Sequence, residues 1–523
     1  MVGFSLVLRP LAPVDETRYV SVAWEMWVRG DLLVPHLNGL PYSDKPPLMF
    51  WLIQLGWHAF GVEAWWPRLV PPLFALANLF LTAALARRLW PDRPAVARLA
   101  PLVLLGFLLW AVYSTVLMFD MLVTTFVLLA MMGFHRARHE GGVRPWVWTG
   151  LALGAGILAK GPVALLPALG VVLSPAWWEE RERVPAAARP PRGGRWGLGV
   201  LAAVAVAAAV GLAWAIPAAM SGGPAYADAI FRGQTEGRLV QSFAHGRPWW
   251  WYLALLPALL FPYSAWAPLW QSAARLRRQS LEPALRFCVA WVVPTFLVFS
   301  LISGKQPHYL LPLLPAVALV AARLLADVRG EAAAVRFWHL LPPLSSLLIL
   351  GVALLLVRRL TGALRLPAWA ASISPALGVA ALLFCGVLLI GFVRWRPRVL
   401  PTLINVAFVL TAYLGFAEVG RQAYDLGPMA RYLKRIEEQG RPIAFVGEYH
   451  GELHFLGRLE RPFDEIATGQ EAYWLQTHPT GRLVREFRKR PPDAEKAEIL
   501  QPYRGDFLAV LGPGYVRSGQ PSG

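Results

Sequence analysis

The sequence predicts a polytopic α-helical membrane protein with a small α/β domain at its C-terminal end. Of its 523 residues, 56% are hydrophobic and only 16% are charged, and the mean hydropathy is +0.46. Ordinary soluble domains do not have this balance. Apolar runs of about 20 residues, which suffice to cross a bilayer core as helices, recur from residue 66 to residue 420. Beyond Gly420, charges, turns and short β-type runs replace them.

The expected spans alternate between two sides of the membrane, and together they indicate about 12 or 13 crossings. Met1 to Leu8 is too short for the apolar core of a cleavable signal peptide. The spans are expected near residues 66–89, 97–118, 119–134, 146–160, 162–177, 197–220, 251–270, 286–303, 308–327, 338–357, 369–393 and 399–418.

The formal net charge is +18, and the basic residues behind it are distributed among the loops as this topology predicts. Every second loop is basic, as the positive-inside rule produces, so we place these loops in the cytoplasm and expect no nucleic-acid partner. A smaller share of the charge could bind anionic membrane lipids. The basic loops hold Arg87, Arg88, Arg93 and Arg98; Arg136, Arg138 and Arg144; Arg181, Arg183, Arg189, Arg192 and Arg195; Arg275, Arg277, Arg278 and Arg286; Arg323, Arg329 and Arg336; and Arg394, Arg396 and Arg398.

The opposite side then carries most of the remaining polar residues. Segment 12–65 is too polar to span, and it has helical patterns through Glu16–Arg29 and Pro47–Phe60. Tryptophans in these patterns indicate helices that lie flat at the membrane interface. They are Trp24, Trp27, Trp51 and Trp57. A second outer loop is expected at 221–250.

The region 421–523 is predicted to be a soluble α/β domain on the outer side, leaving 1–420 as the membrane domain. Ile443–Val446 and Phe507–Leu511 are short apolar runs bounded by turn residues, which is typical of buried strands. About a hundred residues lie within the usual size range of a domain.

Two isolated carboxylates on the outer side are candidates for catalysis. Asp15 opens the string Asp15-Glu16-Thr17-Arg18-Tyr19, where a carboxylate could act as a general base or hold a cation against a phosphate. An acidic residue in a first helical turn would equally suit the helix dipole. Asp120 stands between two apolar runs, where an unpaired carboxylate is expensive, so a paired or functional role is favoured.

Three lysines reach the same side. Lys45 precedes Pro46-Pro47, Lys160 lies at the Lys160-Gly161-Pro162 corner, and Lys305 lies in the turn Ser303 to Pro312. An ammonium group there could neutralise a lipid phosphate and help a leaving group to depart. The alternative is a lysine that only extends its charge to the interface.

The loop 221–250 ends in a cationic and aromatic stretch. Arg247 precedes Pro248-Trp249-Trp250-Trp251-Tyr252, which suits an anionic headgroup held at the membrane surface. His245 together with Asp44 could form part of a divalent metal site, although the spacing identifies no third ligand.

The string of motifs resembles the ArnT family of aminoarabinose transferases, within the polyprenyl-phosphate-dependent GT-C-type glycosyltransferases that include the protein mannosyltransferases. The matching strings cover residues 15 to about 315. They are Asp15-Glu16-Thr17-Arg18-Tyr19, Lys45-Pro46-Pro47-Leu48, Phe119-Asp120-Met121-Leu122, Lys160-Gly161-Pro162, His245-Gly246-Arg247-Pro248-Trp249-Trp250 and Ser303-Gly304-Lys305 through Pro312.

The resemblance implies a glycosyltransferase of the bacterial inner membrane with a periplasmic active site and C-terminal domain. It would move a sugar, 4-amino-4-deoxy-L-arabinose or a related one, from undecaprenyl phosphate to lipid A or another envelope acceptor. It also implies a full helix before the first acidic motif, which Met1 to Pro13 is too short to supply. No cofactor is implied beyond a divalent metal ion.

The family roles map onto matching positions. Asp15 and Asp120 would be the catalytic carboxylates. The carrier phosphate and lipid would contact Lys45, Lys160, Arg247, Lys305 and Tyr309; the acceptor or its headgroup would contact Glu16, Arg18 and His308; and Asp44 with His245 would take a metal.

A multispan transporter or flippase is the competing class, because it would also carry intramembrane charges. Transporters often show internal repeats and helices broken at the middle of the membrane. The sequence shows no repeat, and its polar residues lie at span ends, so we favour the enzyme. A non-catalytic scaffold would leave Asp120 and Lys160 without a task.

Overall fold

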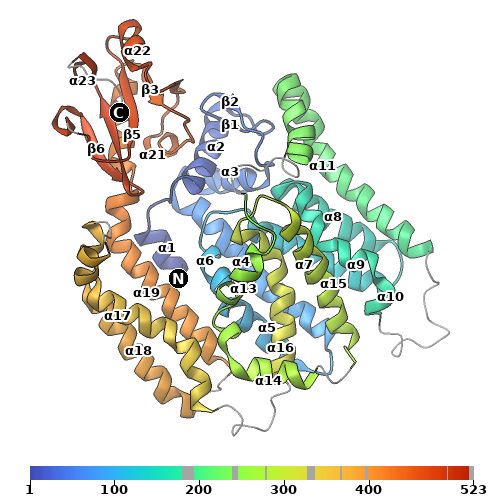
Figure 1. The fold of residues 1–523 in the computed structure, drawn as a ribbon. Coiled ribbons are helices and arrows are strands. Elements are labelled where there is room, and N and C mark those ends of the chain that lie inside the picture. The colour runs from blue at the N-terminus through green and yellow to red at the C-terminus, as the bar shows by residue number, and fades with distance from the viewer. Residues whose placement is uncertain are drawn as a thin grey trace.

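The computed structural model describes residues 1–179, 194–237, 246–276, 280–326, 336–364, 368–394, 398–491 and 493–517. A long bundle of helices carries a small β-sheet domain at one end of its upper face (Figure 1). We call the face that holds this sheet and the first segment of the chain the upper end, and the opposite face the lower end.

The first segment folds into short elements at the upper end. α1 (Val2–Leu8) packs against α4 and α19, and α2 (Asp15–Arg29) follows it. A two-stranded hairpin, β1 (His36–Leu37) and β2 (Leu40–Pro41), leads to α3 (Leu48–Phe60). The two helices expected between residues 12 and 65 are therefore present as α2 and α3.

The membrane domain is helical throughout. Among the described residues, seven helices are long and apolar enough to cross a membrane, namely Trp65–Leu89, Asp120–His139, Arg195–Gly233, Pro283–Leu301, Pro307–Ala326, Phe337–Thr361 and Leu400–Ala417. In chain order the α-helices are α4 (Trp65–Leu89), α5 (Pro94–Gly106), α6 (Leu108–Tyr113), α7 (Asp120–His139), α8 (Arg144–Lys160), α9 (Leu169–Leu173), α10 (Pro175–Trp178), α11 (Gly194–Asp228), α13 (Trp251–Leu259), α14 (Ala267–Leu276), α15 (Pro283–Leu301), α16 (Leu314–Ala326), α17 (Leu341–Ala363), α18 (Pro375–Arg394) and α19 (Leu400–Tyr424).

Three expected spans are interrupted rather than continuous. Residues 97–118 divide into α5 and α6 at Phe107, and the free Leu108 N–H donates to the Phe261 carbonyl at 2.9 Å. Residues 251–270 divide into α13, a 3-10 turn at Tyr263–Ala265 and α14, because Pro262 cannot continue the hydrogen-bond ladder. Residues 162–177 form the 3-10 helix η1 (Pro162–Ala168) followed by α9 and α10.

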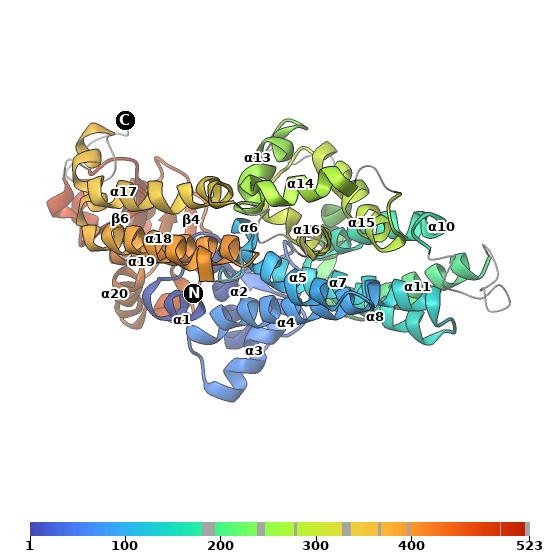
Figure 2. The ribbon, with the colours of Figure 1, turned by 90° about the horizontal axis from the view of Figure 1, so that it is seen from below.

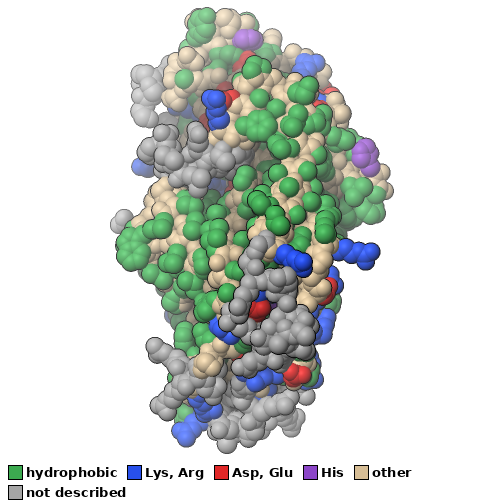
Figure 3. All heavy atoms as spheres, turned by 90° about the vertical axis from the view of Figure 1, so that its right-hand side faces the viewer, with side chains coloured by type: hydrophobic (Ala, Val, Ile, Leu, Met, Phe, Trp, Pro, Cys, Tyr) green, Lys and Arg blue, Asp and Glu red, His purple; other side chains and the backbone are tan. Residues whose placement is uncertain are grey.

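The helices spread into an elongated layer. Seen from below, α17, α18 and α19 lie side by side toward one end, while α8 and α11 lie toward the other (Figure 2). The side that carries α11 presents hydrophobic side chains over much of its area, with lysines and arginines gathered lower down (Figure 3). Leu198, Leu201, Ile216 and Met220 of α11 are all exposed, as expected of a helix that faces lipid.

The C-terminal region folds around a five-stranded sheet of order β4-β3-β5-β7-β6. β3 pairs in parallel with β4 and β5, and β7 pairs antiparallel with β5 and β6. β3 and β7 coincide with the two strands expected from the sequence. The elements are α20 (Gly427–Glu438), β3 (Ile443–Val446), α21 (His454–Gly457), β4 (Asp464–Ile466), α22 (Glu471–Thr477), β5 (Arg482–Phe487), β6 (Ile499–Tyr503), β7 (Asp506–Leu511) and α23 (Pro513–Arg517).

Two tryptophans of the first segment pack against the C-terminal domain. Trp24 is 9% exposed, and its indole N–H donates to the Leu459 carbonyl at 2.8 Å. Trp57 is 1% exposed and stacks on Phe455 with ring centroids 5.4 Å apart. The expectation that Trp24 and Trp57 anchor a helix at the lipid surface is therefore wrong, because the C-terminal domain covers both rings.

Candidate active site

The centre of the candidate site is an ion pair between two helix ends. α7 begins at Asp120 and α8 ends at Lys160, and the two helices pack as antiparallel neighbours. This arrangement brings the two residues together at the upper end, where Lys160 Nζ lies 2.6 Å from Asp120 Oδ1. The side chains are 13% and 3% exposed, so the pair is shielded from bulk water.

The corner after Lys160 depends on a glycine. Gly161 ends α8 with φ of 82°, and Pro162 then starts η1. A residue with a side chain is strained at this positive φ, whereas glycine adopts it readily. The string Lys160-Gly161-Pro162 thus stops the helix directly after the lysine and fixes its position.

The pair has one vacant acceptor. Asp120 Oδ2 is buried and has no hydrogen-bond partner among the described residues. Buried polar atoms are almost always paired, so an unpaired buried oxygen is a candidate acceptor for a ligand. Asp120 is recognisable in the sequence, but its free oxygen follows only from the packing.

The turn after α15 supplies aromatic partners. Tyr309 and His308 lie in the 3-10 helix η6 (Pro307–Leu313), which packs against α7. Lys160 Nζ lies 4.8 Å from the centroid of the Tyr309 ring, within the range of a cation–π contact. His308 packs its ring against Tyr113, and the charges of Asp15, Asp120, Lys45 and Lys160 all act on its imidazole.

The first segment approaches this cluster from above. Asp15 is exposed at the start of α2 and accepts a hydrogen bond from the Tyr19 hydroxyl at 3.3 Å. Burial raises the pKa of Tyr19 well above its usual value, so the phenol stays protonated as a donor. Tyr19 packs edge-on against Phe119, next to Asp120, at 4.8 Å, and Lys45 Nζ lies 6.0 Å from the Tyr19 ring centroid.

Arg18 lies one turn along α2 from Asp15. It is half-buried and interacts electrostatically with Tyr42 and Asp15. Its Nε is buried without a hydrogen-bond partner in the described part of the chain. The structure therefore brings Asp15, Arg18, Lys45, Asp120, Lys160, His308 and Tyr309 into one cluster at the upper end.

Glu16 belongs to the scaffold rather than to the open site. It is 1% exposed, and its two oxygens accept hydrogen bonds from Arg9 at 2.5 and 2.8 Å. The same oxygens accept from the backbone N–H groups of Leu117 and Ala12 at 2.8 and 2.7 Å. These protein donors saturate the carboxylate, so it has no free position for the acceptor contact that the resemblance implied.

Lys305 is likewise held by the protein. It is 2% exposed, and its ammonium donates to the Arg247 carbonyl at 3.0 Å and to the Ile302 carbonyl. Arg247 N–H in turn donates to the Ser303 carbonyl at 3.0 Å, which closes the two segments on each other. Lys305 therefore joins loop 246–247 to the turn before η6. The guanidinium of Arg247 is exposed and lies over Trp251 at 5.8 Å.

The metal hypothesis has no ligand set in the described part of the chain. No group of three or more His, Cys, Asp or Glu residues described here could hold an ion. Asp44 is exposed on the first segment. His245 lies outside the described residues.

An apolar cavity adjoins the cluster. It has a volume of about 290 Å³ and lies between α6, α13, α15 and the η6–α16 segment. Leu310, the neighbour of Tyr309, is part of the wall, so the polar cluster and the apolar cavity meet along η6. Leu109, Leu256, Leu259, Leu260, Val292, Val293, Phe296, Leu297, Leu313, Leu314 and Val317 complete the lining. No sequence pattern indicates this cavity, because its walls are ordinary apolar spans.

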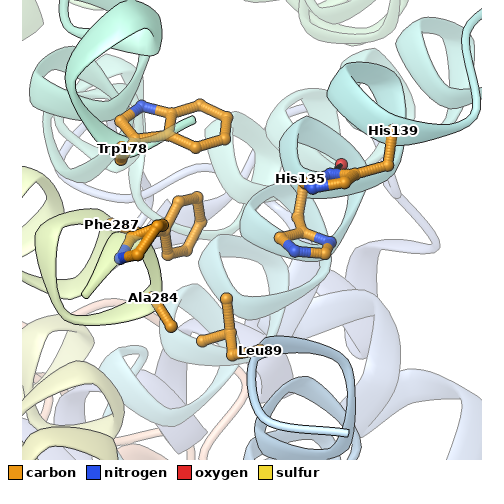
Figure 4. A pocket seen from close by; sticks show the side chains of 7 residues that line it. Leu89, His135, His139, Trp178, Ala284 and Phe287 are labelled. Carbon is orange, nitrogen blue, oxygen red and sulfur yellow. Dashed lines mark hydrogen bonds between the residues drawn. The ribbon is translucent and has the colours of Figure 1, made fainter. Parts of the chain in front are cut away.

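A second, small pocket lies far from the cluster around Asp120 and Lys160, at the other end of α7. His135 and His139 stack with ring centroids 4.2 Å apart, facing Trp178, Ala284 and Phe287 (Figure 4). Asp120 starts α7 and His139 ends it, so the length of the helix separates this pocket from the site.

Comparison with known proteins shows which proteins this chain resembles in sequence and fold. Residues 44–187 match the family model described as dolichyl-phosphate-mannose-protein mannosyltransferase. Curated relatives named undecaprenyl phosphate-alpha-4-amino-4-deoxy-L-arabinose arabinosyl transferase include one from Pseudomonas paraeruginosa, 33% identical over 65% of this chain and 59% of the relative. One from Pseudomonas fluorescens is 33% identical over 60% of this chain and 55% of the relative. The chain thus matches less than two thirds of the length of these relatives.

Solved structures extend the likeness to the whole fold. The crystal structure of ArnT from Cupriavidus metallidurans bound to undecaprenyl phosphate has a TM-score of 0.73 and 22% identity, covering 97% of this chain and 96% of that one. The Archaeoglobus fulgidus oligosaccharyltransferase follows with a TM-score of 0.50 and 12% identity, covering 92% of this chain and 68% of that one. By fold, this multi-pass membrane protein is therefore similar to ArnT and shares the GT-C-type architecture, and by sequence it is similar to the arabinosyl transferases over 65% of its length.

Proposed function

We propose that the chain transfers a sugar from undecaprenyl phosphate to lipid A or another envelope acceptor, on the periplasmic side of the bacterial inner membrane. The donor sugar is 4-amino-4-deoxy-L-arabinose or a related sugar. The observation that carries the proposal is the cluster of Asp15, Lys45, Asp120 and Lys160, together with the apolar cavity whose wall includes Leu310 of η6. The names of the curated relatives and the undecaprenyl phosphate bound to the ArnT crystal structure support the choice of donor.

The apolar cavity and the cations suit the two halves of a carrier lipid. Part of the polyprenyl chain would lie along the walls formed by α13, α15 and α16, since apolar surface favours burial there. Its phosphate would then contact Lys45, Lys160 and Tyr309 at the rim of the cavity. Arg247, on the exposed loop, would be a further contact for the phosphate. Lys305 would contribute chiefly by holding that loop in place.

The reaction breaks the bond between the anomeric carbon of the sugar and the carrier phosphate oxygen. A bond forms from an acceptor oxygen to the same carbon, and the electron pair of the broken bond leaves with the carrier phosphate. Positive charge at the rim stabilises this leaving group. Asp120 would keep Lys160 aimed at the phosphate, because the two are already paired at 2.6 Å.

Asp15 is the carboxylate with open access to an acceptor. If the acceptor is a hydroxyl, Asp15 takes its proton as the new bond forms. If the acceptor is a phosphate, it is already nucleophilic, and Asp15 positions it instead. Arg18 and His308 flank Asp15 and would contact the acceptor or its headgroup.

Reconstitution tests the proposal directly. The purified chain is placed in vesicles with defined polyprenyl-phosphate sugars and lipid A, and the acceptor lipids are weighed by mass spectrometry. We expect one sugar mass to be added, and Asp15→Asn to slow the reaction about 100-fold or more. Asp31→Asn is the matched control, because Asp31 only caps the backbone at Leu33 and Val34.

Transfer from no carrier, together with substrate flux across the vesicles, would instead establish a transporter. Transfer by Asp15→Asn at the wild-type rate would remove Asp15 from the catalytic role.

A further inference from the structure

We propose that the lower end of the helical bundle binds the phosphate of an anionic phospholipid headgroup, at the rim of the small pocket between α4, α7, α10 and α15. We call this place the lower cation site, and it consists of Arg88, Arg136 and Arg286 around that pocket. The length of α7 separates it from Asp120 and Lys160. The ligand is a lipid of the surrounding membrane, neither donor nor acceptor of a sugar, so its binding does not depend on the proposed function.

Four helices meet around the pocket (Figure 4). α4 reaches it with Leu89, α10 with Trp178 and α7 with His139, each the last residue of its helix. α15 reaches it with Phe287, close to its start. The ring centroid of Phe287 lies 6.1 Å from that of His135 and 5.1 Å from that of Trp178. Side-chain packing thus holds the four helices together at this point.

Three of these helices place an arginine beside the pocket. Arg88 on α4, Arg136 on α7 and Arg286 on α15 are each the direct chain neighbour of a residue that lines it. Each has a buried guanidinium nitrogen without a hydrogen-bond partner in the described ranges, namely Nη1 of Arg88 and Nε of the other two. Buried polar atoms are almost always paired, so three such donors around one pocket indicate a site for an anion.

The carboxylates at this end do not satisfy the three arginines. Glu140 Oε1 lies 3.7 Å from Arg136 Nε, too far for a hydrogen bond, and the Glu140 side chain is 63% exposed. Within the part of the chain that the structure describes, Arg88 and Arg286 have no ion pair. Arg88 and Arg136 also interact electrostatically, as two like charges. An anionic ligand would relieve this repulsion.

A salt bridge fixes the frame of the site. Arg138 Nη2 lies 2.6 Å from Glu179 Oε1, which joins α7 to the residue that follows α10. Trp178 is 2% exposed, and its indole N–H donates to the Val171 carbonyl at 2.9 Å. The ends of α7 and α10 are therefore held in place before a ligand arrives, and preorganised groups lose less entropy on binding.

The surroundings favour a lipid over a free anion. The three arginine-bearing helices belong to the candidate membrane spans, so their lower ends lie at the depth of headgroups. Leu173 of α9 is 72% exposed, and Trp177, which precedes the pocket-lining Trp178, is 41% exposed. Exposed tryptophan is typical of the interface between acyl chains and headgroups. Basic pockets between the ends of spanning helices bind anionic headgroups.

The pocket itself is too small for a phosphate. Its volume of about 10 Å³ has room for no more than a water molecule. The phosphate would therefore lie at the rim, against the arginine side chains, with the acyl chains along the apolar surface. Substitution of the arginines is then the direct way to test the site.

The test titrates phosphatidylglycerol into the purified full chain in an uncharged detergent, and native mass spectrometry measures the bound lipid. Arg88→Gln removes one cation of the site. Arg87→Gln is the matched control, because it removes the same charge from the exposed neighbouring residue. We expect Arg88→Gln to weaken binding about tenfold, as for loss of a hydrogen bond between charged groups, and Arg87→Gln to change it by less than about twofold.

A double substitution enlarges the expected difference. Arg88→Gln combined with Arg136→Gln should weaken binding about 50-fold, because two contacts to one phosphate are lost. Arg87→Gln combined with Arg144→Gln removes two exposed charges from the same end and should stay within about threefold of the wild type. The melting temperature should follow the same order, since phosphatidylglycerol stabilises only a protein that binds it.

Two further probes identify the ligand. Phosphatidylcholine carries a phosphate whose charge is offset by choline, so it should bind at least about tenfold more weakly than phosphatidylglycerol. Inorganic phosphate lacks acyl chains and should not displace the lipid at equal concentration. Displacement by inorganic phosphate would mean that the site takes a free anion, and equal affinity for phosphatidylcholine would mean that it does not select charge. Either result would overturn the inference.

The variants decide where the lipid binds. Wild-type affinity in Arg88→Gln combined with Arg136→Gln, or an equal loss in the exposed pair of substitutions, would also overturn the inference. Arg136→Gln alone takes over the comparison if Arg88→Gln does not fold, because the Arg136 side chain is 39% exposed and its loss disturbs the packing less. Arg88→Lys keeps the charge and should recover part of the affinity that Arg88→Gln loses.

Discussion

Two buried ion pairs lie close together at the upper end of the molecule, and they differ in how completely their carboxylates are bonded. Glu16 with Arg9 and Asp120 with Lys160 have closest contacts of 2.5 and 2.6 Å, and the two carboxylate residues are 1% and 2% exposed. Glu16 accepts four hydrogen bonds from protein donors. Asp120 accepts one from Lys160, and its second oxygen has no partner among the described residues.

The difference separates a structural pair from one that can receive a ligand. Burying a charge is tolerated when its hydrogen-bonding capacity is met, and Glu16 meets that condition entirely within the protein. It ties the start of α2 to Leu117, three residues before Asp120, and so sets how the two candidate catalytic helices meet. Asp120 keeps an acceptor free where substrate would arrive.

The largest expected effect is on stability, from Glu16→Gln. Each oxygen of Glu16 faces two N–H donors, so the amide nitrogen would face a donor whichever way it turned. Arg9 would also lose its buried counter-charge. We expect the free energy of unfolding to fall by about 3–5 kcal/mol, measured by denaturant titration of the purified chain in detergent.

Arg9→Met combined with Glu16→Gln is the control for this effect. Removing both charges should recover part of the lost stability, because no uncompensated buried charge remains. A Glu16→Gln protein as stable as the wild type would show that the carboxylate is not saturated as the geometry indicates.

The next effect is on turnover, from Lys160→Met. Methionine keeps much of the length of the lysine but cannot stabilise a leaving phosphate, so kcat should fall about 10²–10³-fold. The free energy of unfolding should fall as well, because the change leaves the buried Asp120 carboxylate without its counter-charge, so kcat is compared per folded molecule. Transfer kinetics and a thermal unfolding curve on the same sample would check both statements, and unchanged kcat would exclude Lys160 from the phosphate site.

The sequence could predict the elements that depend on local pattern. α2 and α3 followed from helical periodicity, and β3 and β7 from apolar runs between turn residues. Asp120 and Lys160 were recognisable because each interrupts a long apolar run, and each does lie at a helix end.

What the sequence could not supply was the partner of each group. Asp120 meets Lys160 across 40 residues, and Glu16 meets Leu117 across 101. Trp24 read as an interfacial anchor because its contact with Leu459, 435 residues away, leaves no local pattern. Saturation of a carboxylate is a tertiary property, so Asp15, Glu16 and Asp120 looked alike in the sequence.

His454 is a third kind of buried group, because it is neutral and both of its ring nitrogens have hydrogen-bond partners. It gives a prediction for the pH dependence of stability. His454 is 5% exposed, its Nδ1 pairs with the Tyr449 hydroxyl at 2.7 Å, and its Nε2 pairs with the Arg461 carbonyl at 3.1 Å. Burial lowers its pKa from 6.5 to about 4. Because the unfolded chain binds the proton first, stability should fall as the pH drops from about 6.5 to about 4, by about 3 kcal/mol in all.

The measurement is the difference in unfolding free energy between wild type and His454→Gln at each pH. Subtracting the two values isolates the contribution of His454. Glu452 has a raised pKa, so through this group acidification favours the folded state, but the contribution is the same in both proteins and cancels. A difference that stays constant between pH 6.5 and pH 4 would mean that His454 is already charged in the folded state or is not protonated on unfolding.

The smallest expected effect completes the comparison of the two carboxylates. Asp120→Asn makes the same chemical change as Glu16→Gln, but its amide nitrogen can occupy the position of Oδ2, which faces no donor in the part of the chain that the structure describes. Oδ1 can still accept from Lys160, but Lys160 loses its counter-charge, so the free energy of unfolding should fall by about 2 kcal/mol, less than in Glu16→Gln. Denaturant titration beside Glu16→Gln measures this directly. If Asp120→Asn proved as damaging as Glu16→Gln, the second oxygen of Asp120 would have a donor in the folded protein, and the distinction between a saturated and an open carboxylate would fail.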